Sequence, residues 1–178
     1  MKEFKDRVFE KDLQEARMLF EMITFNNILD DETVNELVSL VDFEIQNFLC
    51  NTVPKYQSRS DMHMKYKSNV HFQKFFSVVE KILLEEINNN LQVSLCWFNV
   101  CKKDSKFAFH THKESVVTAV FFLKNCKGNG TQIKFDNSVL QLMVKDNDLV
   151  FFNPDIMHRI PDYNGLDRYS IALDFVQR

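Results

Sequence analysis

Two strand-like runs joined by a turn decide the fold: Val116-Val-Thr-Ala-Val-Phe-Phe-Leu123 and Thr131-Gln-Ile-Lys-Phe-Asp136. β-Branched and aromatic residues favour extended strands, while the glycines and asparagines between the two runs favour a turn. The same pattern recurs on both sides, in the segments Gln92–Cys101, Lys106–His112, Val139–Val144, Asp148–Asn153, Met157–Pro161 and Tyr169–Val176. Eight short strands in succession predict an all-β barrel or jelly roll over residues 91–178.

The first ninety residues have a different pattern, with apolar residues at helical spacing. One stripe consists of Val34, Leu37, Val38, Val41, Ile45 and Phe48 and follows the acidic cluster Asp30–Glu32, which we expect to cap a helix. A second stripe consists of Phe72, Phe75, Phe76, Val79, Leu83 and Ile87. Residues 18–25 have the composition of a strand. We therefore predict a mainly β, α+β protein with one domain over 1–178, in which a helical support region, 1–90, precedes a β core, 91–178.

The segment Asn51–Asn69, between the two predicted helices, has no steady hydrophobic period and contains four basic residues, Lys55, Arg59, Lys65 and Lys67. A loop of this length in a compact domain is either functional or disordered. Two interpretations stay open, a solvated surface connection and a lid over a substrate.

Composition and charge exclude several classes of protein. No apolar run approaches the roughly 20 residues of a membrane-spanning helix. Charges of both signs in Met1–Arg7 argue against a signal peptide, so we expect a soluble, cytoplasmic protein. With 22 Lys and Arg against 25 Asp and Glu, the net charge is −3, which argues against nucleic-acid binding. The four cysteines, Cys50, Cys96, Cys101 and Cys126, form no C-x-x-C pair, so we expect reduced and mostly buried thiols.

Three histidines in the β half have the spacing of metal ligands. His110 and His112 are two residues apart in a predicted strand, so both side chains point to the same face. The second and seventh strands of a double-stranded barrel are neighbours, so His158 could add a third ligand from the opposite wall. Three imidazoles on one side of an ion suit iron, zinc, copper or nickel and leave positions open for other ligands.

Arg168 and Ser170 strengthen this interpretation because they also share one face of a predicted strand. A guanidinium beside a hydroxyl can bind a carboxylate with two hydrogen bonds. Four further residues are candidates for lining the same cavity: Trp97, Asn99, Phe122 and Gln132.

The segment from about Cys96 to Phe175 resembles the 2-oxoglutarate and Fe(II)-dependent oxygenases. The resemblance rests on the order and spacing of Phe109-His-Thr-His112, Phe152-Asn-Pro-Asp155, His158 and Arg168-Tyr-Ser170. It is closest to the small single-domain branch that is related to prolyl hydroxylases and common in phage and viral genomes, and it extends over nearly the whole chain. It implies a double-stranded β-helix, a jelly-roll or cupin-like barrel supported by helices.

The resemblance also implies roles for individual residues. His110 and His158 would be iron ligands, and Arg168 with Ser170 would bind the carboxylate of 2-oxoglutarate. The sequence departs from the family at His112, where an aspartate or glutamate is usual. Either His112 is the third ligand, which we favour, or the motif is shifted and Glu114 takes that place. Three neutral imidazoles would lack the negative charge of a carboxylate ligand, so the activity could be weak.

The implied cofactors are Fe(II), 2-oxoglutarate as co-substrate and O2. The implied reaction hydroxylates a peptide or protein side chain, or a small amino-acid-like molecule, with release of succinate and CO2. Two other functions stay open. One is a cupin-like three-histidine iron dioxygenase that does not use 2-oxoglutarate, and the other is a binding module that has kept the barrel without the chemistry.

Overall fold

The computed structural model describes residues 22–47, 57–87, 90–102, 107–128, 130–135, 138–161 and 166–178. No helix in these ranges is both long enough and apolar enough to cross a membrane.

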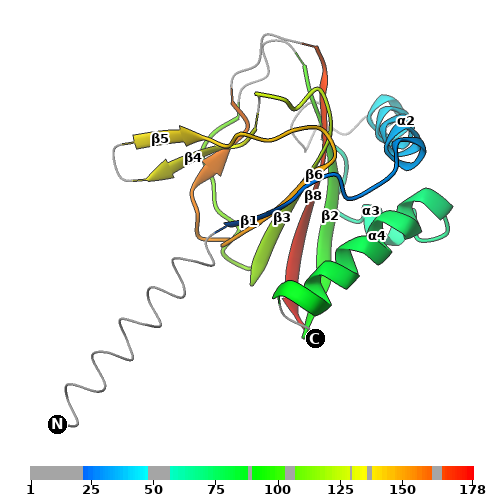
Figure 1. The fold of residues 1–178 in the computed structure, drawn as a ribbon, viewed down its shortest axis with the longest axis horizontal. Helices are drawn as coiled ribbons and strands as arrows, with labels where there is room; N and C mark the ends of the chain where they lie inside the picture. Colours follow the sequence, from blue (N-terminus) through cyan, green and yellow to red (C-terminus); the bar gives the residue numbers. More distant parts are fainter. Residues whose placement is uncertain are drawn as a thin grey trace.

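The strands form two antiparallel sheets, and the larger one includes β1 from the N-terminal half of the chain (Figure 1). The larger sheet has the strand order β1-β6-β3-β8-β2, and the smaller one has the order β5-β4-β7. The strands are β1 (Met22–Phe25), β2 (Leu91–Cys101), β3 (Val117–Lys124), β4 (Gln132–Phe135), β5 (Ser138–Gln141), β6 (Asp148–Phe152), β7 (His158–Arg159) and β8 (Arg168–Gln177). The long central strands β3 and β8 are buried along most of their length, because one face is covered by helices and the other faces the interior between the sheets.

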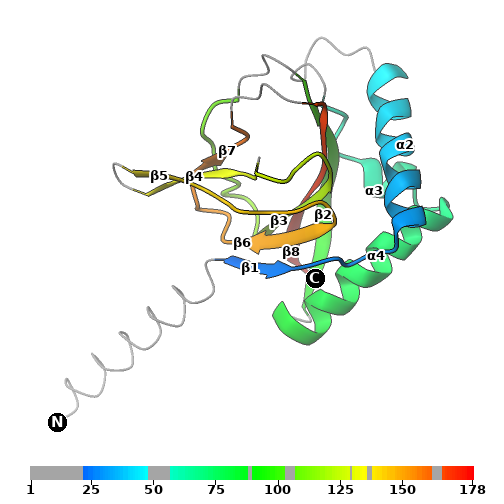
Figure 2. The ribbon, with the colours of Figure 1, turned by 45° about the horizontal axis from the view of Figure 1, so that its top comes forward.

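The helices lie on one face of the larger sheet (Figures 1 and 2). They are α2 (Asp31–Asn47), α3 (Met62–Lys65) and α4 (Val70–Ile82), and α4 continues into the π-helical turn η1 (Leu83–Ile87). Asp30 precedes α2, and its carboxylate accepts a hydrogen bond of 3.0 Å from the backbone N–H of Thr33, as the capping cluster predicted. Asn69 caps α4 in the same way through the N–H of Phe72.

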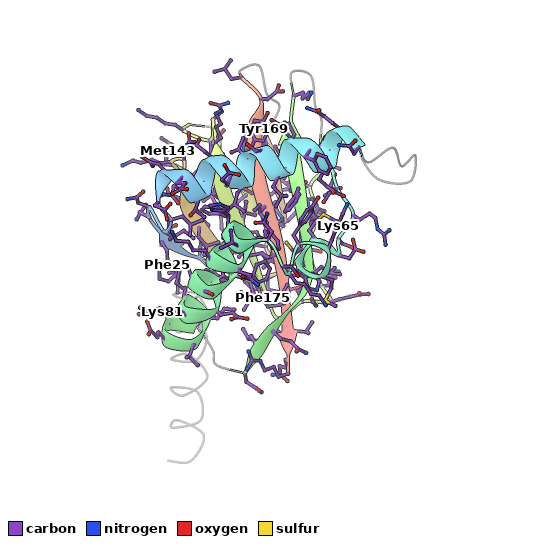
Figure 3. The ribbon with its side chains drawn as sticks, turned by 90° about the vertical axis from the view of Figure 1, so that its right-hand side faces the viewer. Phe25, Lys65, Lys81, Met143, Tyr169 and Phe175 are labelled. Atoms are coloured by element: carbon purple, nitrogen blue, oxygen red, sulfur yellow. The ribbon has the colours of Figure 1, made fainter. Side chains whose placement is uncertain are left out.

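The side chains of β8 point alternately to the two faces of the larger sheet. Tyr169, Ile171, Leu173 and Phe175 belong to the core that packs against the helices. Figure 3 looks onto those helices, with Tyr169 beside α2, where its hydroxyl donates to Asp42 at 3.0 Å. The residues of opposite parity are Arg168, Ser170, Ala172 and Asp174. Since side chains alternate along a strand, these four point to the interior between the sheets.

The structure confirms most of the predicted elements and corrects two. The predicted strand Lys106–His112 is wrong for residues 107–112, where only His110 forms a bridge, to His158. The predicted loop Asn51–Asn69 contains α3 and two bridges to β2, formed by Gln57 and Asp61. The rest of that prediction, residues 51–56, lies outside the described residues, as do Phe48 and residues 18–21 of the first strand-like run.

Candidate metal centre and anion pocket

A cavity that is partly open to solvent lies between the two sheets. It is lined by β2, β3, β7, β8 and the segments around His110 and Thr131. All five residues that the sequence predicted for the site line it: His110, His112, His158, Arg168 and Ser170. Of the four candidate lining residues, Trp97 and Asn99 do so, whereas Gln132 and Phe122 do not.

The three histidines converge at one end of this cavity. One ring nitrogen of each lies within 4.8 Å of the others, so that together they could hold one metal ion. His110 and His158 lie on adjacent segments and exchange two backbone hydrogen bonds, both 2.9 Å long. The prediction that the segments of His110 and His158 are neighbours is therefore confirmed, but His158 lies beside His110 and does not reach in from an opposite wall.

Each of the three imidazoles is oriented by a hydrogen bond at its Nδ1 atom. That of His110 lies 3.1 Å from the carbonyl oxygen of Ala108, and that of His158 lies 2.9 Å from the carbonyl oxygen of Ile156. These oxygens can only accept hydrogen bonds, so each Nδ1 must carry the proton. In a neutral imidazole the other nitrogen, Nε2, then keeps its lone pair, which is the state that binds a metal.

The third ring, that of His112, is held by a carboxylate. Its Nδ1 lies 2.8 Å from Oδ2 of Asp174, and its Nε2 is buried without a hydrogen-bond partner among the described residues. Trp97 stacks on the ring, with centroids 5.5 Å apart and an interplanar angle of 11°. A buried nitrogen lone pair with no donor to meet it is unfavourable, and a metal ion would satisfy it.

Loss of hydration favours the neutral form of the other two histidines. His158 is buried, and removal of its ring from water lowers its pKa to about 4. His110 is exposed as a residue, but partial removal of its ring from water lowers its pKa as well. Both rings are therefore uncharged near neutral pH and need lose no proton to act as ligands.

Glu114, the alternative third ligand, is exposed and does not belong to the one group of potential ligands found among the described residues. His112 does belong to it. The geometry therefore favours the interpretation that His112 and not Glu114 completes the set.

Arg168 lies fully buried in the cavity wall, with 1% of its surface exposed. None of its three guanidinium nitrogens has a hydrogen-bond partner within the described part of the chain. The guanidinium lies 5.2 Å from the ring centroid of Phe122, and the buried thiols of Cys101 and Cys126 are close enough for its charge and weak hydrogen bonding to act on them. None of these neighbours carries a negative charge. A buried charge without an anionic partner is costly, so this pocket is suited to an anion.

Ser170 lies one pleat further along β8, also buried and on the same face as Arg168. Its predicted position beside the guanidinium follows directly from the alternation of the strand. Cys96, Cys101 and Cys126 are free and buried, as predicted, and Cys50 lies outside the described residues.

Sequence reasoning missed Asp174 and Thr118. The hydroxyl of Thr118 donates to Oδ1 of Asp174 at 2.8 Å, so the carboxylate is held from both sides. Asp174 is an even number of residues from Arg168 and Ser170 in β8, so its side chain lies on the same face. This spacing could have identified Asp174 from the sequence.

Comparison with known proteins places this geometry in a structural context. No protein-family model and no curated protein sequence matches the chain. Among solved structures, a prolyl-4-hydroxylase from Pseudomonas putida superposes with a TM-score of 0.68 at 15% identity, covering 92% of each chain. A prolyl hydroxylase from Trichoplax adhaerens, in complex with a peptide fragment of the hypoxia inducible factor oxygen degradation domain, gives 0.65 at 15% identity, covering 93% of this chain and 92% of that one.

HygX from Streptomyces hygroscopicus, solved with nickel and 2-oxoglutarate bound, gives a TM-score of 0.66 at 11% identity, covering 89% of this chain and 82% of that one. A structure from Burkholderia pseudomallei, described as an oxidoreductase of the 2OG-Fe(II) oxygenase family, is also similar. The resemblance predicted from the sequence is thus confirmed in three dimensions: the chain has the fold of these oxygenases.

Proposed function

We propose that the protein is an Fe(II)- and 2-oxoglutarate-dependent oxygenase built on a double-stranded β-helix. The observation that carries the proposal is that one cavity contains both three convergent histidines and a buried arginine without a partner. The first arrangement suits a divalent metal, and the second suits the carboxylate of a co-substrate bound to that metal.

Each residue would have a defined task in binding. His110, His112 and His158 would hold Fe(II) through their Nε2 atoms, since Nδ1 of each is already engaged. Arg168 and Ser170 would bind the distal carboxylate of 2-oxoglutarate, with the guanidinium supplying charge and the hydroxyl a further donor.

When bound, iron with 2-oxoglutarate would supply oxidative chemistry that uses O2, releases succinate and CO2, and hydroxylates the substrate. The contribution of the chain is to orient these groups and to exclude water. Trp97 and Val120 line the cavity and reduce its access to solvent, which strengthens the electrostatic interactions inside it.

A peptide or protein side chain, or a small amino-acid-like molecule, is the substrate class that we propose. It is supported by the similarity to two prolyl hydroxylases, one of them bound to a peptide. HygX, with nickel and 2-oxoglutarate bound, supports the co-substrate.

The cupin-like alternative, an iron dioxygenase without 2-oxoglutarate, gives no task to Arg168 and Ser170. A binding module without chemistry would likewise leave the neutral, oriented histidines without a role. Both alternatives are retained as outcomes of the experiment.

The experiment is an anaerobic titration of the purified protein with Fe(II) and then 2-oxoglutarate, followed by admission of O2. We expect a saturable visible charge-transfer band, its loss on exposure to O2, and formation of succinate. Zinc in place of iron is the blank. Iron binding without the band would favour the cupin-like enzyme, and no iron binding would favour the binding module.

Two variants link the result to the site. Arg168→Met should retain iron binding and weaken the binding of 2-oxoglutarate by about 100-fold, which corresponds to the roughly 3 kcal/mol of a charged hydrogen bond. Arg59→Met is the matched control, because it removes the same charge from an exposed ion pair with Asp61 outside the cavity. Equal 2-oxoglutarate affinity in both variants would contradict the role of Arg168.

A further inference from the structure

The carboxylate of Asp174 contacts the ring of His112, one of the three histidines. Oδ2 of Asp174 lies 2.8 Å from Nδ1 of His112, and Oδ1 accepts a hydrogen bond of 2.8 Å from the hydroxyl of Thr118. Both carboxylate oxygens are therefore engaged, and the ring of His112 separates the carboxylate from the point where the three histidines converge.

Asp174 is buried, and the described residues around it offer little positive charge. Asp174 is 4% exposed, and among the described residues its only ion-pair partner is His112. A buried carboxylate is costly unless it is hydrogen-bonded and faces a positive charge. Thr118 supplies a hydrogen bond but no charge, and Nδ1 of His112 supplies a second hydrogen bond. A cation beyond the ring would supply the missing charge.

We propose that Asp174 is the positioning residue of the metal centre, and that it supplies, through His112, the negative charge that a site of three histidines otherwise lacks. The proposal rests on the proposed function, since it assumes that the histidines bind a metal. It also changes the expectation of weak activity, because the charge would be present one hydrogen bond behind the ligand.

The mechanism has two parts, orientation and charge. The Nδ1–H group of His112 donates to a full negative charge, which fixes the tautomer and makes Nε2 a stronger donor to a metal. The plane of the ring is fixed separately by stacking on Trp97. Asp174 therefore contributes mainly through its charge, and a variant that keeps the shape but removes the charge separates the two parts.

Asp174→Asn is that variant. Its amide oxygen can still accept a hydrogen bond from Nδ1 of His112. Its amide NH2 group can donate to the hydroxyl oxygen of Thr118, so we expect the fold and the tautomer to be preserved. We expect Fe(II) and Co(II) to bind about 10- to 100-fold more weakly than in the wild type. We also expect a higher Fe(III)/Fe(II) midpoint potential, because a nearby negative charge stabilises the trivalent ion more than the divalent one.

Ser94→Ala is the matched control. The hydroxyl of Ser94 donates to the backbone carbonyl of Asp174 at 3.1 Å, so this variant removes a hydrogen bond at the same residue without touching the carboxylate. It should leave the metal affinity and the potential unchanged. Thermal unfolding of both metal-free variants verifies that they fold.

The midpoint potential decides the outcome. A rise in Asp174→Asn but not in Ser94→Ala supports the proposal. An unchanged potential in Asp174→Asn overturns it, whatever happens to the affinity, since the charge would then not act on the metal. Failure of the wild type to bind either metal is a separate result, which overturns the proposed function itself.

Discussion

His110 and His158 form a hydrogen-bonded antiparallel pair in which each backbone N–H donates to the carbonyl oxygen of the other, at 2.9 Å in both directions. Residues paired in this way have their Cα atoms about 5.5 Å apart and their side chains on the same face. The backbone N–H of His112 is likewise held, by the carbonyl oxygen of Pro154 at 2.9 Å. The main chain thus fixes the three rings relative to one another before any ion binds.

The assignment of the third ligand leads to a comparison of two neighbouring variants. His112→Ala should reduce the affinity for Co(II) by at least about 100-fold, because it removes the proposed ligand and leaves Asp174 without its donor. Glu114→Ala should leave the affinity unchanged, because that side chain is exposed. Competition with a coloured chelator measures both. The reverse order of effects would restore the shifted interpretation, in which Glu114 is the ligand.

The buried guanidinium of Arg168 should make the protein without ligands less stable than it would be with an apolar residue there. Arg168→Met should raise the free energy of unfolding by about 1–3 kcal/mol, since it removes a desolvated charge that has no anionic partner in the described chain. Urea denaturation of the metal-free proteins measures this. Addition of 2-oxoglutarate to the metal-loaded forms should stabilise the wild type more than the variant at the same concentration. A loss of stability in the variant would mean that the charge is already compensated.

Asn147 connects the N-terminal segment to the turn before β6, and its substitution should destabilise the fold. Its side chain accepts from the N–H of Leu29 at 3.0 Å and donates to the carbonyl oxygen of Leu29 and to Asn27, while its own φ is +70°. Asn147→Ala loses these bonds and strains the backbone, so we expect a cost of about 3–4 kcal/mol. Asn147→Gly, which accepts this φ without strain, should cost about 1 kcal/mol less. Equal costs in chemical denaturation would show that the backbone conformation does not matter.

The hydrogen bond between Tyr169 and Asp42 should produce a loss of stability at alkaline pH. Burial, followed by the hydrogen bond to Asp42, raises the pKa of Tyr169 to about 12 from the ordinary value of 10. A group whose pKa is higher in the folded state stabilises the fold fully below pH 10 and loses this contribution between pH 10 and 12.

Tyr169→Phe tests this. The variant should be about 1–2 kcal/mol less stable than the wild type at pH 8, and the difference should shrink as the pH rises from 10 to 12. Urea denaturation at pH 8, 10 and 11 measures the trend. Tyr66, whose pKa is also raised by burial, is present in both proteins and cancels. A difference that stays constant with pH would contradict the role of the hydroxyl proton.

The sequence predicted those features of the site that depend on local periodicity. Alternation along a strand correctly placed Arg168 and Ser170 on one face. His110 and His112 also line the cavity, but the strand predicted to carry them does not form, and only His110 makes a β-bridge. Alternation shows which face of a strand a side chain is on, but it does not show which residues of that face reach the cavity. Phe122, a predicted lining residue, packs beside the guanidinium of Arg168 and does not line the cavity.

Contacts between residues far apart in the sequence could not be predicted from local patterns. Asp174 is 62 residues from His112 in the sequence, and only the pairing of β3 with β8 brings its carboxylate to Thr118. Gln132 accepts a hydrogen bond from Nε of Arg159 at 2.8 Å, a contact set by the register between β4 and β7. The short helix α3 has only four residues, too few to show a helical period.

The position of β8 in the larger sheet has a consequence for how the protein is made. β8 follows every other described strand in chain order, yet it lies between β2 and β3 and joins them. During synthesis, β2 and β3 cannot pair with β8 until β8 has been made. Pairing between strands so far apart in sequence is slow, and the unpaired strands are prone to aggregation. β8 also contains Arg168, Ser170 and Asp174, so its pairing with β2 and β3 brings these side chains to the candidate site. A nascent chain that has not yet reached β8 therefore lacks part of the candidate site.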